Sequence, residues 1–253
     1  MGFVKTKTEL DFYYGLGMRK FFDAEMLGVM FETKPEIIAR LLPPPLEPDV
    51  PNGLLFIARY PQTNLGPGYR EAALFIRCQY RGEAGSYCLA MPIESEESRL
   101  YNGRDIFGFP KKLARIHLER RGDAATGWVE RHGVRFVEVN AKFSGRLPQM
   151  PAQGPNFLFK GMPKIDLSPG FDGPVLLCRH QTAVEMKSME IGSAEVRYQP
   201  SEDDPWSEVE VVKVLAGFYL VSDNTMPPGK VLAEVDGDAY LPYYYKITDL
   251  YKG

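Results

Sequence analysis

The chain has 253 residues, 44% of them hydrophobic, so it can bury a sizeable core. Its 30 basic and 33 acidic side chains give a formal net charge of -3, which provides no basic field suited to a nucleic-acid backbone. The sequence begins without a long apolar h-region and contains no run of about eighteen apolar residues. We therefore expect a single cytoplasmic domain over 1–253, with neither nucleic acid nor a membrane as a partner.

The first strong helix signal lies at 33–42. Thr33 and Glu36 have the spacing of a capping box, with Thr33 as the expected N-cap, and an apolar stripe follows them. The prolines of 43–45 end this pattern. We expect one amphipathic helix here.

Most later signals are those of short strands. The chain contains 24 glycines and 21 prolines, which separate the strand signals by short connections. This pattern favours an antiparallel sheet that curls or closes, and it disfavours a βαβ arrangement. The longest loops are expected at 145–154 and 201–205, the second with an acidic tip that is typical of a solvated turn. The expected strands are 54–60, 72–80, 86–91, 114–120, 127–131, 134–144, 156–160, 175–183, 194–198, 209–219 and 231–235.

The cysteines and histidines show no metal-binding pattern. Three cysteines without a CxxC spacing favour a reducing compartment, and we expect buried apolar roles for Cys78, Cys88 and Cys178. The three histidines are scattered and lack an HExxH spacing, so no metal site is expected. His117 alternates with apolar neighbours, as on a half-buried strand, and is expected to face solvent or an interface.

Two adjacent lysines, Lys111 and Lys112, follow Pro110 in a segment rich in apolar residues. Apolar surroundings penalise the ammonium form and lower the pKa of a buried lysine. A neutral lysine can condense with a ketone to form a Schiff base, whereas an ordinary lysine, with a pKa of about 10.4, is almost wholly protonated. The alternative is that the pair is solvated surface charge.

The wider pattern favours chemistry. Residues 103–114 read Gly-Arg-Asp-Ile-Phe-Gly-Phe-Pro-Lys-Lys-Leu-Ala and resemble the lysine motif of the acetoacetate decarboxylase family, whose namesake is a known example of an enzyme with an activated lysine. Three further blocks resemble the family in the same order: the early helix with its proline-rich exit at 31–48, the glutamate segment at 69–71 and the Pro-Asn-aromatic stretch at 155–163.

The resemblance implies an α+β, mainly antiparallel fold, in which a curled sheet closes into a cone-like β-barrel with a few flanking helices around a central cavity. It implies that Lys111 is the Schiff-base lysine, that Lys112 is a neighbouring cation and that Glu71 orients substrate or shuttles a proton. An ordinary ion pair with Arg70 or Arg77 is the alternative for Glu71.

The same resemblance suggests two substrate-binding positions. Met91 corresponds to an apolar pocket residue, although core packing explains a methionine there equally well. Arg104, kept by the lysine motif, is a candidate to hold a substrate carboxylate. The implied activity is that of a carbon–carbon lyase that decarboxylates a β-keto acid, acetoacetate or larger, to a ketone and carbon dioxide. No metal or organic cofactor is implied, and a homo-oligomer is expected.

One departure from the family pattern concerns substrate choice. The segment at 19–26 aligns with a stretch in which decarboxylating members carry an arginine before a glutamate, and here that position is Ala24. A guanidinium there would hold a carboxylate as a fork, so its loss opens two alternatives. One is an aldolase or dehydratase that uses Lys111 on pyruvate or another keto acid, and the other is a non-catalytic ligand-binding protein.

Activation of Lys111 has two possible causes, its burial and the charge of Lys112. Adjacent side chains point to opposite faces of a strand and diverge by about 100° on a helix. We therefore hypothesise that burial is the larger cause and that Lys112 points away.

Overall fold

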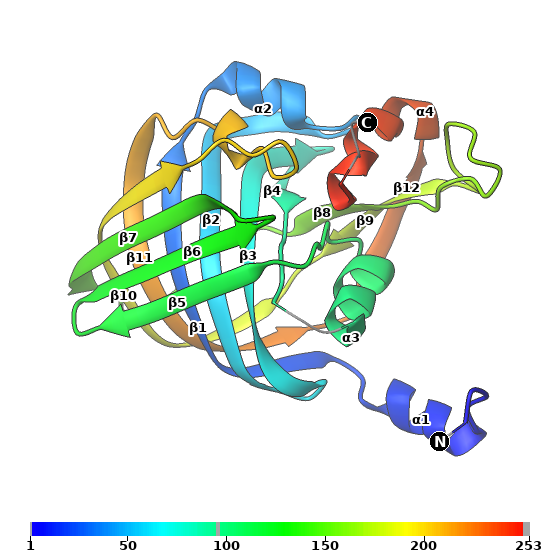
Figure 1. Cartoon of the computed structure of the whole chain (residues 1–253), viewed down its shortest axis with the longest axis horizontal. Helices are drawn as coiled ribbons and strands as arrows, with labels where there is room; N and C mark the ends of the chain where they lie inside the picture. The colour runs from blue at the N-terminus through cyan, green and yellow to red at the C-terminus, as the bar shows by residue number, and fades with distance from the viewer. Residues whose placement is uncertain (1, 95–96, 250–253) are drawn as a thin grey trace.

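The computed structural model describes residues 2–94 and 97–249, and one twelve-stranded sheet dominates this part of the chain (Figure 1). Its strand order is β12-β9-β8-β4-β3-β2-β1-β11-β10-β7-β6-β5, and every pairing is antiparallel except that of β4 with β8. The strands are β1 (Arg19–Glu32), β2 (Glu47–Thr63), β3 (Gly66–Tyr80), β4 (Glu83–Ala90), β5 (Arg115–Arg121), β6 (Ala124–Arg131), β7 (Val134–Arg146), β8 (Asn156–Lys160), β9 (Val175–His180), β10 (Ala183–Tyr198), β11 (Lys213–Met226) and β12 (Lys230–Val235).

Within the described residues, the sheet curls over itself but does not close. Strands β5 and β12 end the order, and the described residues show no pairing between them, so the expected closed barrel is not confirmed. The two layers meet through side chains instead: Gly127 of β6 faces Ile57 of β2, and Ile116 of β5 is buried in the same apolar cluster. Apolar packing between layers therefore takes the place of hydrogen bonds between edge strands.

The central strands bury both of their faces. Along β2, Leu55 and Ile57 belong to the core between the layers, whereas Phe56 and Ala58 belong to a second apolar cluster on the opposite face. Because successive side chains of a strand point to opposite faces, this explains why 54–60 is a continuous apolar run. The second cluster forms part of the cavity described below.

Strand β1 was not among the expected strands, and its irregular pattern has a physical cause. Its pairing with β11 shifts register between Phe21 and Ala24, and Asp23 has a φ of 52°. Such a bulge adds a residue to one strand and changes which face the following side chains occupy. The alternation that would have indicated a strand is therefore broken.

The helices are few and flank the sheet (Figure 1). Helix α2 confirms the expected helix, but its N-cap is Lys34 without a side-chain hydrogen bond, so the predicted capping box was wrong. Thr33 stays with the sheet, since its backbone N–H donates to Pro51 O at 2.8 Å. The helices are α1 (Lys7–Gly15), α2 (Pro35–Leu41), α3 (Glu97–Leu100), α4 (Gly237–Tyr244), the π-helix η1 (Tyr101–Phe107) and the 3-10 turns η2 (Trp206–Glu208) and η3 (Tyr245–Ile247).

Several smaller expectations can be compared with the structure. The three cysteines are buried and free, as expected, and His117 is half exposed on β5, where its ring stacks on Trp128. The expected strand 209–219 begins only at Lys213, because a 3-10 turn precedes it. No helix in the described residues has the length and apolar character needed to cross a membrane.

Candidate active site

Lys111 and Glu71 form a buried ion pair, and a short ladder of bridges brings them together. Glu71 on β3 pairs with Ile93, and Ile93 pairs in turn with Leu113. The Ile93 N–H donates to Lys112 O at 2.8 Å, which fixes the lysine segment against β3. Lys111 Nζ then donates to Glu71 Oε2, with only 5% and 7% of the two side chains exposed. The glutamate and the lysine of the two sequence blocks therefore meet.

Two tyrosines hold the carboxylate of Glu71 from the other side. Tyr60 OH donates to Oε1 and Tyr69 OH donates to Oε2, each at 3.4 Å. Burial, followed by the neighbouring Glu71 charge, raises the pKa of both phenols well above the ordinary value. Both tyrosines therefore remain protonated donors, and the carboxylate has a fixed position beside the amine.

The π-helix η1 packs directly on the lysine. A Cβ built on Gly103 would overlap Lys111 Cε, so only glycine leaves room for the lysine stem. The helix ends at Gly108, whose φ of 88° and close approach to Phe159 O also favour glycine. The glycines of the motif thus shape the slot that holds Lys111.

This slot opens into a cavity of about 600 Å³. Apolar side chains of the second cluster form much of its wall, together with residues of β11. Its size falls within the range of about 300–1,000 Å³ that is usual for small-molecule pockets. The wall includes Phe21, Met26, Phe56, Phe75, Met91, Phe107, Phe109, Phe218 and Leu220.

Lys112 points into a separate ionic cluster. Its Nζ lies 3.2 Å from Asp204 Oδ1 and 3.0 Å from Asp249 Oδ1, and Arg131 pairs with the same two carboxylates at 2.7 Å. Asp204 is only 3% exposed, so the expectation that the whole acidic tip at 202–204 is a solvated turn was wrong. The reason is that two cations from distant segments neutralise the buried carboxylate.

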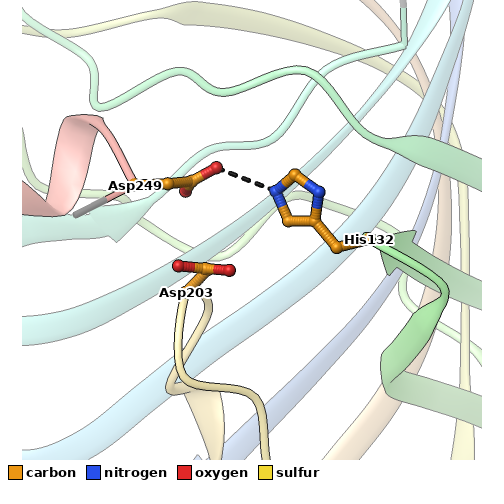
Figure 2. A group of neighbouring side chains, drawn as sticks. All are labelled: His132, Asp203 and Asp249. Atoms are coloured by element: carbon orange, nitrogen blue, oxygen red, sulfur yellow. Dashed lines mark hydrogen bonds and ion pairs between the residues drawn. The ribbon is translucent and has the colours of Figure 1, made fainter. Parts of the chain in front are cut away.

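The same cluster contains a group with the composition of a cation site. Figure 2 shows His132, Asp203 and Asp249, whose potential ligand atoms lie within 4.8 Å of one another. His132 Nε2 lies 2.9 Å from Asp249 Oδ2, and Arg131 and Lys112 also bind that carboxylate. Protein cations thus already supply positive charge to Asp249.

The other site residues expected from the sequence divide into two groups. Met91 is 4% exposed and lines the cavity. Arg104 lies outside the cavity lining, and its Nε donates to Asp105 at 2.9 Å, so the geometry gives the expected carboxylate role no support. Arg70 pairs with Glu94 and Arg77 with Asp49, so the alternative ion pairs for Glu71 are not formed.

Sequence reasoning missed the two tyrosines and two arginines of the cavity. Arg19 and Arg99 line it, with Arg99 3% exposed and 5.3 Å from the ring centre of Tyr69. A signal existed for Tyr69, which stands two residues before Glu71 and shares its face of a strand. Arg19 was hidden because β1 was not expected to be a strand.

Comparison with known proteins identifies the family of the chain. The sequence model described as acetoacetate decarboxylase (ADC) matches residues 6–235. The chain therefore belongs to the acetoacetate decarboxylase family. It is 28% identical over 229 residues to the acetoacetate decarboxylase of Burkholderia cenocepacia, covering 87% of this chain and 90% of that protein. It is also 28% identical over 234 residues to acetoacetate decarboxylase 2 of Mesorhizobium japonicum, covering 90% and 87%.

Solved structures share the fold. The acetoacetate decarboxylase of Legionella pneumophila superposes with a TM-score of 0.76 at 24% identity, covering 86% of this chain and 88% of that one. The enduracididine biosynthesis enzyme MppR complexed with pyruvate gives 0.75 at 20% identity, covering 86% and 91%. An acetoacetate decarboxylase-like enzyme from Sphingomonas wittichii gives 0.78 at 18% identity, covering 87% and 94%.

Proposed function

We propose that this protein is a Schiff-base lysine enzyme that decarboxylates a β-keto acid, acetoacetate or larger, to a ketone and carbon dioxide. The observation that carries the proposal is the buried Lys111–Glu71 pair at the wall of a largely apolar cavity. Membership of the family and the relatives named acetoacetate decarboxylase support the same reaction.

The reaction begins with attack of the Lys111 amine on the ketone carbon. Only an uncharged amine carries the required lone pair. Transfer of a proton from Nζ to the Glu71 carboxylate removes two charges from a site in which the two side chains are only 5% and 7% exposed. Relief of the cost of burying these charges offsets the lost attraction between the ammonium and the carboxylate. Loss of water from the adduct then gives an iminium.

The iminium supplies the driving force for loss of carbon dioxide. The bond between the α-carbon and the carboxylate breaks, its electron pair moves toward the iminium nitrogen, and carbon dioxide leaves with formation of an enamine. Protonation on carbon and addition of water return the ketone product and the free lysine. Glu71, held by Tyr60 and Tyr69, is positioned to accept and return the protons of these steps.

A second reaction is favoured by one specific observation. Ala24, at the position of the family arginine, is 1% exposed and packs in the apolar cluster at the cavity. An apolar residue there suits an aldolase or dehydratase that acts on pyruvate or another keto acid through the same lysine. The structural neighbour MppR was solved in complex with pyruvate, which supports keeping this alternative.

Borohydride reduction in the presence of keto acids tests both reactions. We expect acetoacetate, a longer β-keto acid or pyruvate to give an adduct that mass mapping places on Lys111. Release of carbon dioxide from a β-keto acid supports the decarboxylase, and consumption of an aldehyde together with pyruvate supports the alternative. A folded protein that forms no adduct with any of these acids would favour a non-catalytic ligand-binding role.

Mapping must separate Lys111 from Lys246, a half-buried lysine whose ammonium group lies among protein groups. Burial lowers the pKa of Lys246 to about 7, and its Nζ donates to Tyr87 OH at 2.6 Å and to Cys88 O at 2.7 Å. Lys246 lies outside the cavity lining. Lys246→Met is therefore a control that keeps the adduct, whereas Lys111→Ala abolishes it.

A further inference from the structure

The bulge in β1 aligns four side chains on one side of the sheet. In a regular strand Phe21 would share its face with residues 23 and 25. The register shift after Phe21 changes that parity, so Phe21 and Met26 both line the cavity and Ala24 packs in the apolar cluster beside them. Arg19, two residues before Phe21, occupies the same face and also lines the cavity. Strand β1 therefore has no guanidinium at Ala24, the position of the family arginine, but Arg19 places a guanidinium at the cavity.

A short chain of contacts connects this guanidinium to the lysine. Arg19 Nε donates to Asn102 Oδ1 at 3.0 Å, and Asn102 is 7% exposed in the π-helix. The next residue, Gly103, is the one that packs on Lys111 Cε. Arg19 is therefore anchored to the same turn of helix that forms the lysine slot.

Within the described part of the chain, no acidic group balances the charge of Arg19. Its Nη1 donates to Gly17 O at 2.9 Å and its Nη2 to Tyr13 OH at 3.4 Å, and no carboxylate pairs with it among the side chains that the structure describes. Arg77, another cation of the lining, pairs with Asp49 at 2.8 Å. A guanidinium has five N–H donors, so Arg19 keeps donors for an anion in the cavity.

We propose that Arg19 binds the carboxylate of the keto acid whose ketone reacts with Lys111. The inference rests on the proposed function and assigns the carboxylate-binding role to a residue that the family pattern does not place there. A guanidinium fork matches a carboxylate in geometry and forms charge-assisted hydrogen bonds with it. Arg19 thereby determines the preference of the cavity for keto acids over uncharged ketones.

The test compares two probes that differ in charge. Acetoacetate carries the carboxylate, and 2-butanone replaces it with an uncharged methyl group while still forming a reducible iminium. For each probe, the concentration that gives half-maximal borohydride trapping on Lys111 is measured. In Arg19→Met we expect this concentration to rise at least about tenfold for acetoacetate and to change less than about twofold for 2-butanone. Arg19→Lys, which keeps the charge without the fork, should fall between the two.

Lys20→Met is the matched control. Lys20 is the next residue of the same strand, is exposed and lies outside the cavity lining, so its loss removes an equal charge without affecting either probe. If the half-maximal concentration in Arg19→Met shifts equally for both probes, or shifts for neither, the inference is overturned. Trapping on Lys111 of the native protein would still uphold the proposed function in that case. Native protein that traps 2-butanone but not acetoacetate would also overturn the inference. Native protein that traps neither probe would overturn the inference together with acetoacetate-type imine chemistry.

Discussion

Lys111 and Lys112 are neighbours in the chain, but their side chains lie in separate environments. Lys111 pairs with Glu71 at the cavity, and Lys112 pairs with Asp204 and Asp249 in the ionic cluster. This divergence agrees with the hypothesis that Lys112 points away from Lys111. The part of the hypothesis that experiment must test is that burial, and not the charge of Lys112, activates the Lys111 amine.

The two lysines can be separated by substitution. Lys111→Ala should abolish trapping of keto acids. Lys112→Met should retain most of the trapping and lower the free energy of unfolding by about 1–3 kcal/mol, because Asp204 loses a partner while Arg131 remains. Trapping and urea unfolding are measured on both variants. Equal loss of trapping in the two proteins, with folding intact, would contradict the burial hypothesis.

Gly103→Ala should act on the reaction through the position of Lys111. The added methyl group needs the space that Lys111 Cε occupies, so the amine must move. A misplacement of a reacting group by about 1 Å costs on the order of 100-fold in rate, and we expect a decrease of this order. Single-turnover trapping measures the rate. Gly15→Ala is the matched control, because nothing lies within 4 Å of its added Cβ. A native trapping rate in Gly103→Ala would show that the slot is not required.

Glu71→Gln should keep the shape of the site and remove its proton acceptor. Loss of general acid–base catalysis typically costs about 10²- to 10⁴-fold, and we expect a decrease in this range in the rate of adduct formation. Glu94→Gln is the control, since Glu94 is a nearby carboxylate that pairs with Arg70 and not with Lys111. A comparable decrease in the control would indicate a general electrostatic effect.

His180 should contribute to the dependence of stability on pH. It is 2% exposed, its ring lies 4.7 Å from that of Phe107, and burial lowers its pKa from 6.5 to about 4. Between these values the unfolded chain binds the proton and the folded chain does not. Stability therefore rises with pH across this window, by up to about 1.4 kcal/mol per pH unit. Below about pH 4 this contribution is lost.

Urea unfolding at several pH values measures the effect. His180→Phe packs a ring against Phe107 without a titrating group, so the difference in unfolding free energy between native protein and variant should change with pH from about 4 to 6.5 and be constant above it. A difference that is independent of pH would show that His180 does not titrate in this way.

Local sequence was sufficient for much of the strand pattern and for the lysine motif. The apolar run at 54–60 and the alternation over 134–144 predicted β2 and β7 because burial of one or both faces leaves a direct record in residue order. The same reasoning failed for β1, where the bulge at Asp23 depends on the partner strand β11. It also failed for the capping box, because the tertiary bond of Thr33 to Pro51 outweighs the local cap.

The sequence by itself determined which residues could do chemistry: a Lys-Lys pair behind an aromatic-proline turn, a glutamate forty residues earlier and an alanine in place of the family arginine. Only the tertiary structure decided what each of them contacts. The bridge through Ile93 places Glu71 beside Lys111. Ion pairs with Asp204 and Asp249 hold Lys112 away from that site. The bulge in β1 places Arg19 on the face of the strand that lines the cavity. These relations join residues that are distant in the chain, and strand pairing and burial set them, so local patterns do not record them.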